Sequence, residues 1–380
     1  MTAFAPISID MYLAALPTIQ ESLRASPADG QATLAAFLAG MAIGQVIYGP
    51  ASDRFGRRGP VLLGAAIYVA ASVLCALAPT IGVLIAGRFV QALGGCAGAV
   101  VARAVVRDRF GHTETARFLS LMMLVMGLAP ILTPLAGGFM LLFVGWRGIF
   151  WLLAAFGIAI GAAVALFLTE SRSDDTAALA RSENPLRAYL ALLSERRLVG
   201  YALAGALNGA VLFTYISSSP DLVIKQYGVS PQNFGWVFAA NAFGLIGASQ
   251  VNRYLLRTRT PDQVLSWSSL TACGFAALMM LAAATGIGER WTVLPLLFLT
   301  LATYGLMQGN TMAGALSVDP RRAGSISALM GAMSFAVGAV ASWAAGAFHD
   351  GTPRPMAAVM LGALLGSAAA LRFLALPRKT

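Results

Sequence analysis

The sequence predicts an all-α membrane protein that crosses the bilayer many times. Of its 380 residues, 58% are hydrophobic and only 11% are charged, whereas soluble domains carry about 25% charged residues. The mean hydropathy is +0.74, and apolar runs of about 20 residues recur along the chain. A helix of that length spans the hydrocarbon core, so these runs decide the fold class.

Apolar runs between polar or turn-rich breaks predict twelve spans. They lie near residues 1–20, 31–50, 60–78, 81–104, 117–142, 147–168, 198–219, 232–251, 263–285, 292–314, 323–347 and 355–376. A long polar stretch follows the sixth span. We therefore expect an N-terminal six-helix half at 1–169, a linker at 170–197 and a C-terminal six-helix half at 198–380.

The distribution of Lys and Arg predicts the orientation. With the linker placed inside, 20 of the 26 basic residues fall in inner segments, five fall in outer loops, and Arg88 lies within a span. Because Lys and Arg gather in cytoplasmic loops, both termini are expected in the cytoplasm. The same bias explains the net charge of +10 without a nucleic-acid partner, for which no motif is present.

Two ionisable residues lie well inside predicted spans, where each is costly unless it is paired or faces water. Asp10 is expected about 15 Å below the outer face of the first span, and Arg88 about 10 Å below that of the fourth. They could meet or share a water-filled cavity, where Asp10 would load and release a proton with help from Arg88. The alternative is a static ion pair that pins helix 1 to helix 4.

The second span runs into the sequence YGPASDRFGRRGPVLLG, residues 48–64. Gly49 would allow close helix packing, Gly56 a tight turn, and Asp53 could pair with nearby arginines. The stretch resembles the signature loop between helices 2 and 3 of the major facilitator superfamily, with matches at Gly49, Asp53, Arg54, Gly56, Arg57 and Arg58. The resemblance implies that superfamily's fold, twelve helices in two six-helix bundles, and a conformational latch at this loop. A purely topogenic set of arginines would not explain Asp53 or the glycines.

Other stretches resemble the Bcr/CflA group of drug–proton antiporters. SIDMYLAALP is similar to the helix 1 motif, with Ala14 in place of proline, and RFVQALGG is similar to the helix 4 motif around Arg88. APILTPLAGGF resembles the helix 5 antiporter motif, with Thr133 in place of glycine. Pro130, Pro134, Gly137 and Gly138 are its expected residues, in a kinked and closely packed helix.

The resemblance implies export of small amphipathic drugs, driven by proton entry, by a monomer in the bacterial inner membrane. No cofactor or metal is implied. The expected substrate cavity has polar, aromatic and methionine side chains, although any of them could instead be a packing residue. They are Tyr12, Gln91, Met122, Met126, Asn208, Tyr215, Phe238, Asn241, Tyr304 and Gln308.

Other functions stay open on the sequence. The same fold could export a metabolite such as an amino acid or a sulfur compound. An intramembrane enzyme would need clustered His or paired acids within the spans, and a receptor or passive channel would not need a proton gradient. Since Asp10 lies so close to Met1, we also expect the native chain to begin further upstream.

Overall fold

The computed structural model describes residues 1–110, 112–172 and 185–376, all in helices and their connections. The chain divides into two compact units. The first comprises Met1–Leu186 with Ser230–Trp236, and the second comprises Arg187–Val229 with Val237–Thr380. Within the described residues, ten helices are long and apolar enough to cross a membrane. The predicted membrane fold is therefore confirmed.

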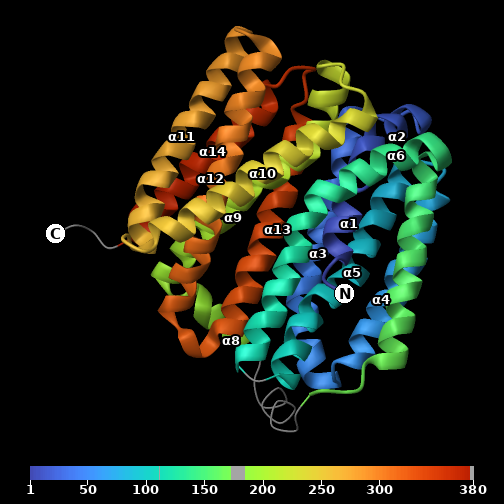
Figure 1. Ribbon diagram of the computed structural model, residues 1–380, viewed down its shortest axis with the longest axis vertical. Helices are drawn as coiled ribbons and strands as arrows, with labels where there is room; N and C mark the ends of the chain where they lie inside the picture. Colours follow the sequence, from blue (N-terminus) through green and yellow to red (C-terminus); the bar gives the residue numbers. More distant parts are fainter. Residues whose placement is uncertain (111, 173–184, 377–380) are drawn as a thin grey trace. The chain divides into compact units, whose positions relative to one another are not determined.

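The first unit begins with a broken helix and continues with four long ones (Figure 1). Its elements are α1 (Phe4–Asp10), the 3₁₀ turn η1 (Leu13–Ala15), α2 (Leu16–Ser22), α3 (Pro27–Phe55), α4 (Arg58–Ala76), α5 (Ile81–Arg109) and α6 (His112–Phe167). Proline at the first position and a reciprocal Ser26–Asp29 capping box start α3, an arrangement that satisfies the free N–H groups of a helix start. The predicted first span is thus three short pieces rather than one helix.

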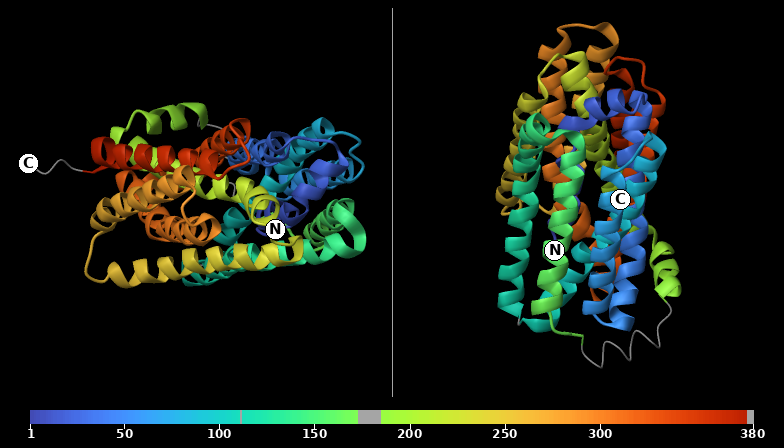
Figure 2. Two further views of the ribbon diagram at one scale, coloured as in Figure 1. Left: turned by 90° about the horizontal axis from the view of Figure 1, so that it is seen from above. Right: turned by 90° about the vertical axis from the view of Figure 1, so that its right-hand side faces the viewer.

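The single element α6 contains two predicted spans, 117–142 and 147–168. Gly145, with φ 65° and ψ −178°, interrupts the helical backbone between them, and glycine adopts such positive φ angles without the steric cost that other residues incur. In Figure 1, α6 runs from one end of the unit to the other and then returns, and Figure 2 shows the same return from a second side. Together with the broken first helix, this explains why twelve predicted spans appear as ten long helices.

Small residues set the packing inside the first unit. Helix α5 lies against both α3 and α4. A Cβ at Gly94 of α5 would come within 2.5 Å of the Gly64 carbonyl of α4, and one at Gly40 of α3 would come within 2.4 Å of the Phe89 carbonyl. Close backbone approach is how helices gain van der Waals contact in lipid, where burial of apolar surface adds no driving force.

The second unit holds the remaining helices, apart from the first two residues of α8 and the first turns of α10. They are α8 (Pro185–Leu193), α9 (Arg196–Pro220), the π-helical turn η2 (Asp221–Gln226), α10 (Pro231–Leu255), α11 (Pro261–Thr285), α12 (Glu289–Val318), η3 (Pro320–Arg322), α13 (Ala323–Ala347), α14 (Arg354–Ala370) and the π-helical turn η4 (Leu371–Ala375). Helix α9 packs against α12, α13 and α14. The α8 helix lies in the predicted linker, whose residues 173–184 are outside the described part.

Candidate functional site

The first span breaks immediately after Asp10. Proline has no N–H, so Pro17 cannot donate to the Leu13 carbonyl, and its ring crowds that carbonyl. The chain instead turns at residues 11–12 and tightens into η1, where Ala15 N–H donates to the Tyr12 carbonyl over 2.9 Å. Asp10 is the last residue of α1 and only 3% exposed. Among the described residues, no hydrogen bond or ion pair engages its carboxylate.

Arg88 of α5 turns to the backbone of helix 1 rather than to the Asp10 carboxylate. Its Nη2 donates to the Ser8 carbonyl over 2.8 Å and its Nη1 to Gln91 Oε1 over 2.6 Å. The alternative interpretation, a static Asp10–Arg88 ion pair, is not found among the described residues, whose ion pairs lie elsewhere. An ion pair between Asp10 and Arg88 is therefore not what holds α1 against α5.

Aromatic rings surround the Arg88 guanidinium. Its Cζ lies 4.2 Å from the ring centre of Tyr12, 4.3 Å from that of Phe37 and 5.8 Å from that of Phe150. Cation–π attraction stabilises a desolvated cation by about 2 kcal/mol. The side chain is fully buried, and its Nε has no hydrogen-bond partner among the described residues. One donor of this buried cation therefore remains available.

A closed circuit of hydrogen bonds joins α1, α4 and α5 around Arg88. Ser8 Oγ and the Tyr68 hydroxyl are 2.6 Å apart, and Ser72 Oγ donates to the Tyr68 carbonyl over 2.7 Å. Gln91 Nε2 donates to Ser72 Oγ over 2.7 Å, and its Oε1 accepts from Arg88. Every member is buried, and hydrogen bonds in a buried network restrict side-chain positions. Of these residues, Ser8, Tyr68 and Ser72 were not among the predicted site residues.

The glycines of the helix 5 motif lie at close backbone contacts. A Cβ at Gly137 would fall 1.8 Å from the Met11 carbonyl oxygen, at the break in helix 1. One at Gly138 would fall 2.7 Å from the Pro231 carbonyl oxygen, at the start of α10. The expected close packing at these two positions is therefore present.

The other residues of the helix 5 motif lie inside α6. Pro130 and Pro134 are both within its helical run, and neither can donate a backbone hydrogen bond. At the departure from the motif, Thr133 donates its hydroxyl to the Ala129 carbonyl over 2.7 Å. The polar group of Thr133 is thus satisfied within its own helix, by a bond to the preceding turn that often bends helices.

The loop at residues 49–58 gathers its charges around Arg57. The Arg57 side chain is only 2% exposed; its Nε donates to Asp108 Oδ2 over 2.8 Å, and its Nη1 donates to Ser52 Oγ over 2.9 Å and to Asp53. Burial alone would lower the pKa of Arg57, but the bonds to Asp108 and Asp53 outweigh it and raise the pKa, so the guanidinium stays charged. Asp108, at the end of α5, was not predicted, since nothing in the sequence ties it to a loop 51 residues earlier.

Glu170 closes the same loop from the far end of α6. Its carboxylate accepts from Arg57 N–H over 2.8 Å and from Arg58 N–H over 3.2 Å, at the free N-terminus of α4. Burial alone would raise the pKa of Glu170, but these N–H groups, with those of Arg172 and Ser171, outweigh it and hold the pKa below its ordinary value. The free N–H groups give a helix N-terminus a partial positive charge, which also favours the ionised carboxylate there.

The two glycines of the loop have different environments. Gly56 ends α3 with φ 95°, and a Cβ there would lie 2.5 Å from Glu170 Oε2. Gly49 lies inside α3, and a Cβ there would meet no atom within 4 Å. The expectation that Gly49 serves close helix packing is therefore wrong in this structure. Arg54 and Arg58 are exposed, and Arg58 Nη2 donates to the Ala165 carbonyl over 2.7 Å.

The predicted cavity residues of the first unit fall into two groups. Tyr12 and Gln91 are fully buried around Arg88, and the Tyr12 hydroxyl lies 3.1 Å from Thr33 Oγ1. On α6, Met122 is half-buried and Met126 is 49% exposed. Tyr12 and Gln91 thus hold Arg88 in place, while the methionines lie at the surface of their helix.

In the second unit three predicted residues meet. Tyr215 of α9 stacks on Phe238 of α10, with ring centres 5.2 Å apart, and Asn241 Nδ2 donates to the Tyr215 hydroxyl over 3.1 Å. These three side chains are buried. These contacts gather an aromatic pair and an amide from α9 and α10 at one place.

The remaining predicted cavity residues lie on α9 and α12. Asn208 Nδ2 is buried without a partner among the described residues, as is Oε1 of the half-buried Gln308. Tyr304 lies one helical turn before Gln308 and is also half-buried. Buried polar atoms without partners are what a site awaiting a ligand or water would show.

Two polar pairs of the second unit were not predicted. Asn252 of α10 and Asn310 of α12 exchange amide hydrogen bonds of 2.8 and 3.5 Å. Asp221, where η2 begins, accepts from Gln226 Nε2 over 3.0 Å and lies 3.4 Å from His349 Nε2. Nothing in the sequence marks either pair, because the partners lie on segments that are far apart along the chain.

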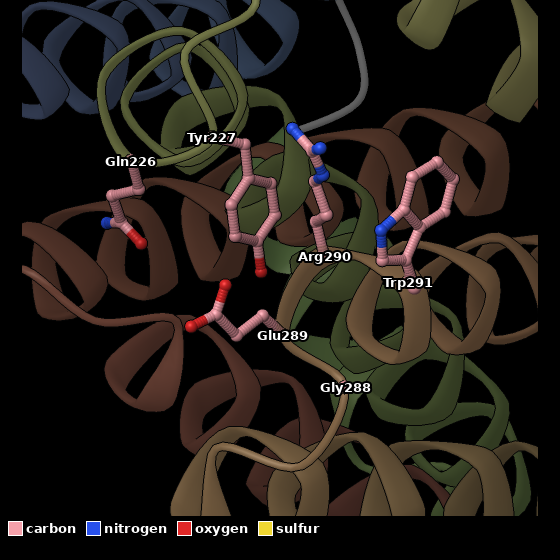
Figure 3. A pocket seen from close by; sticks show the side chains of 6 residues that line it. All are labelled: Gln226, Tyr227, Gly288, Glu289, Arg290 and Trp291. Atoms are coloured by element: carbon pink, nitrogen blue, oxygen red, sulfur yellow. The ribbon is translucent and has the colours of Figure 1, made fainter.

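A shallow pocket of about 370 Å³ opens where α12 begins (Figure 3). It is lined by Gln226, Tyr227, Gly288, Glu289, Arg290 and Trp291. Burial and the nearby Glu289 carboxylate raise the pKa of Tyr227 to about 12, so the phenol stays protonated. Arg290 lies over the Trp291 ring, 5.1 Å from its centre. An exposed tryptophan and arginine at a span end are typical of a membrane–water boundary.

Comparison with known proteins agrees with this arrangement. The Major Facilitator Superfamily matches residues 1–342. The chain belongs to this superfamily. It is 34% identical over 373 residues to the MFS-type transporter YdgK of Bacillus subtilis, covering 97% of this chain and 92% of that one. It is 30% identical to the bicyclomycin resistance protein homolog of Haemophilus influenzae, covering 98% and 94% of the two chains.

Further matches support the superfamily assignment. The multidrug resistance protein MdtL of Escherichia coli is 35% identical over 237 residues, 62% of this chain and 60% of that one. Among solved structures, a D-xylose–proton symporter superposes with a TM-score of 0.71 at 14% identity, covering 97% of this chain and 95% of that one. That likeness concerns the fold alone. The protein is a multi-pass membrane transporter rather than an enzyme.

Proposed function

We propose that this superfamily member exports small amphipathic drugs in exchange for protons. Two of its relatives are named for bicyclomycin and multidrug resistance. The observation that carries proton coupling is Asp10, a buried carboxylate at a helix break with no partner among the described residues. An unpaired intramembrane acid is costly, so a functional role is the default hypothesis.

The mechanism follows from the placement of this acid. Protonation of Asp10 from the periplasm would neutralise a buried charge and favour release of the drug, and deprotonation to the cytoplasm would favour drug binding. Rocking of two six-helix bundles, residues 1–169 and 198–380, would expose the acid to each side in turn. Residues 49–58 would latch one of the two states through Arg57 and Asp53.

The topology that supports this mechanism is also part of the proposal. We place the chain in the bacterial inner membrane with both termini in the cytoplasm, because the basic residues concentrate on that side. It would work as a monomer, since each bundle supplies its own buried polar network. Blue-native electrophoresis and reporter fusions at the two termini would test these points.

Drug-dependent proton movement tests the function directly. Purified protein in liposomes with an imposed pH gradient should move protons when a substrate from a panel of amphipathic drugs is added, and the Asp10→Asn variant should not. Undiminished coupling in the correctly folded Asp10→Asn protein would refute the role of this acid. Efflux that persists without any gradient would instead indicate a channel.

A further inference from the structure

The helix break leaves one backbone carbonyl free two residues before Asp10. In a continuous helix the Ser8 carbonyl would accept from Tyr12 N–H. Since α1 ends at Asp10, that bond is not made, and the carbonyl accepts from Arg88 Nη2 instead. A backbone acceptor within a membrane needs such a partner, so Arg88 stabilises the broken form of helix 1.

A second backbone carbonyl, that of Met11 directly after Asp10, lies in close contact with α6 at Gly137. The Met11 carbonyl oxygen lies where a Cβ on Gly137 would be, 1.8 Å from its ideal position, and the Met11 carbonyl carbon lies 2.8 Å from it. Any side chain at position 137 would push this stretch of helix 1 off α6. Gly127, ten residues earlier on the same helix, has no atom within 4 Å of its would-be Cβ. Gly127 is therefore a position on α6 where a side chain can be added without touching helix 1.

We propose that Arg88 and Gly137 are positioning residues for Asp10, which hold it through the Ser8 and Met11 carbonyls on either side. The inference rests on the proposed role of Asp10 as proton site and adds how that site is kept in place. Because these contacts fix the backbone on both sides of Asp10, any slackening of helix 1 changes how deeply its carboxylate is buried. Proton affinity depends on desolvation, so the two contacts set the pH at which Asp10 exchanges its proton.

The residue types fit this assignment. Arg88 uses two divergent N–H groups at once, one for Ser8 and one for Gln91, while its flat face lies on Tyr12. A lysine ammonium offers the same charge without the planar fork. Arg88→Lys would therefore keep the cation and lose the hold on the Ser8 carbonyl.

The first measurement is the pH profile of drug-dependent proton exchange in proteoliposomes. We expect the midpoint to shift by about one pH unit in Gly137→Ala and in Arg88→Lys. Gly127→Ala is the matched control on α6. Arg147→Lys is the control for arginine, because Arg147 also donates over 3.0 Å to a backbone carbonyl, that of Ala78, which is not part of helix 1. Unshifted midpoints in both test variants, or equal shifts in the controls, would overturn the proposal.

The second measurement separates the proposal from the proton role of Asp10. Amide exchange of residues 11–16, followed by mass spectrometry in nanodiscs, should increase in Gly137→Ala and Arg88→Lys, also when each is combined with Asp10→Asn. Retained coupling in Asp10→Asn alone would refute the proposed function and leave this structural test intact. Unchanged exchange in monodisperse Arg88→Lys protein would refute the positioning role, even if Gly137→Ala failed to fold.

Discussion

Replacement of Arg57 by alanine should destabilise the first unit more than any other single change in the 49–58 loop. The guanidinium is 2% exposed and bonds Asp108, Ser52 and Asp53. Removing one partner of a buried ion pair costs about 3–5 kcal/mol, and Asp53, whose side chain is 41% exposed, recovers part of its loss in water. We therefore expect a loss of about 3 kcal/mol.

The coupling between Arg57 and Asp108 isolates the buried contact. In a double-mutant cycle of Arg57→Ala and Asp108→Asn, followed by denaturant unfolding in detergent micelles, we expect a coupling energy of about 2 kcal/mol. Arg58→Ala is the control, because Arg58 is exposed and its side chain donates to the Ala165 carbonyl; its loss should stay below about 1 kcal/mol. A coupling energy below about 0.5 kcal/mol, or equal losses for Arg57 and Arg58, would refute the reasoning.

Three further outcomes follow from the same contacts. Glu170→Gln should lower thermal stability at neutral pH. Because the pKa of Glu170 is held below its ordinary 4.5, the wild-type protein should be more stable than the variant above pH 4.5, and this difference should disappear as the pH falls through the lowered pKa. A stability difference that persists in acid would contradict this. Gly56→Ala should lower the unfolding free energy by about 1–3 kcal/mol, because Gly56 has a φ of 95°. Gly49→Ala should leave it unchanged. A larger loss for Gly49→Ala than for Gly56→Ala would contradict this account of the loop. Asn310→Leu should destabilise by leaving Asn252 unpaired in the interior, and adding Asn252→Leu should restore stability; a double variant worse than the single one would argue against an isolated pair.

Much of the fold could be predicted because membrane spans have a strong compositional signal. The positions of the long apolar runs come from hydropathy, and the 49–58 loop stands out by its residue pattern. The break in helix 1 could also have been predicted. The signal is Pro17, which cannot donate to the Leu13 carbonyl. The apolar run continues through Pro17, however, and hydropathy alone does not distinguish a continuous span from a broken one.

The partners of the site residues could not be predicted from sequence. Two ionisable residues in neighbouring spans suggest an ion pair, yet Arg88 bonds the Ser8 carbonyl, which becomes available only because the helix breaks. Glu170 and Asp108 lie 113 and 51 residues from Arg57, and only the packing of α4, α5 and α6 brings them together. Backbone acceptors are invisible in a residue pattern, since every residue has one.

The broken first span has a consequence for how the protein is assembled. When helix 1 enters the lipid, its break exposes carbonyl groups that no later turn of the same helix can satisfy. Helix α5 enters with the opposite defect, a buried arginine that has no water. Each element alone would leave a polar group unpaired in lipid, and the Arg88 guanidinium and the Ser8 carbonyl pair with each other. Biogenesis should therefore keep the first span near the translocon until α5 emerges, and a chain truncated before Arg88 should leave the first span prone to slip back out of the bilayer.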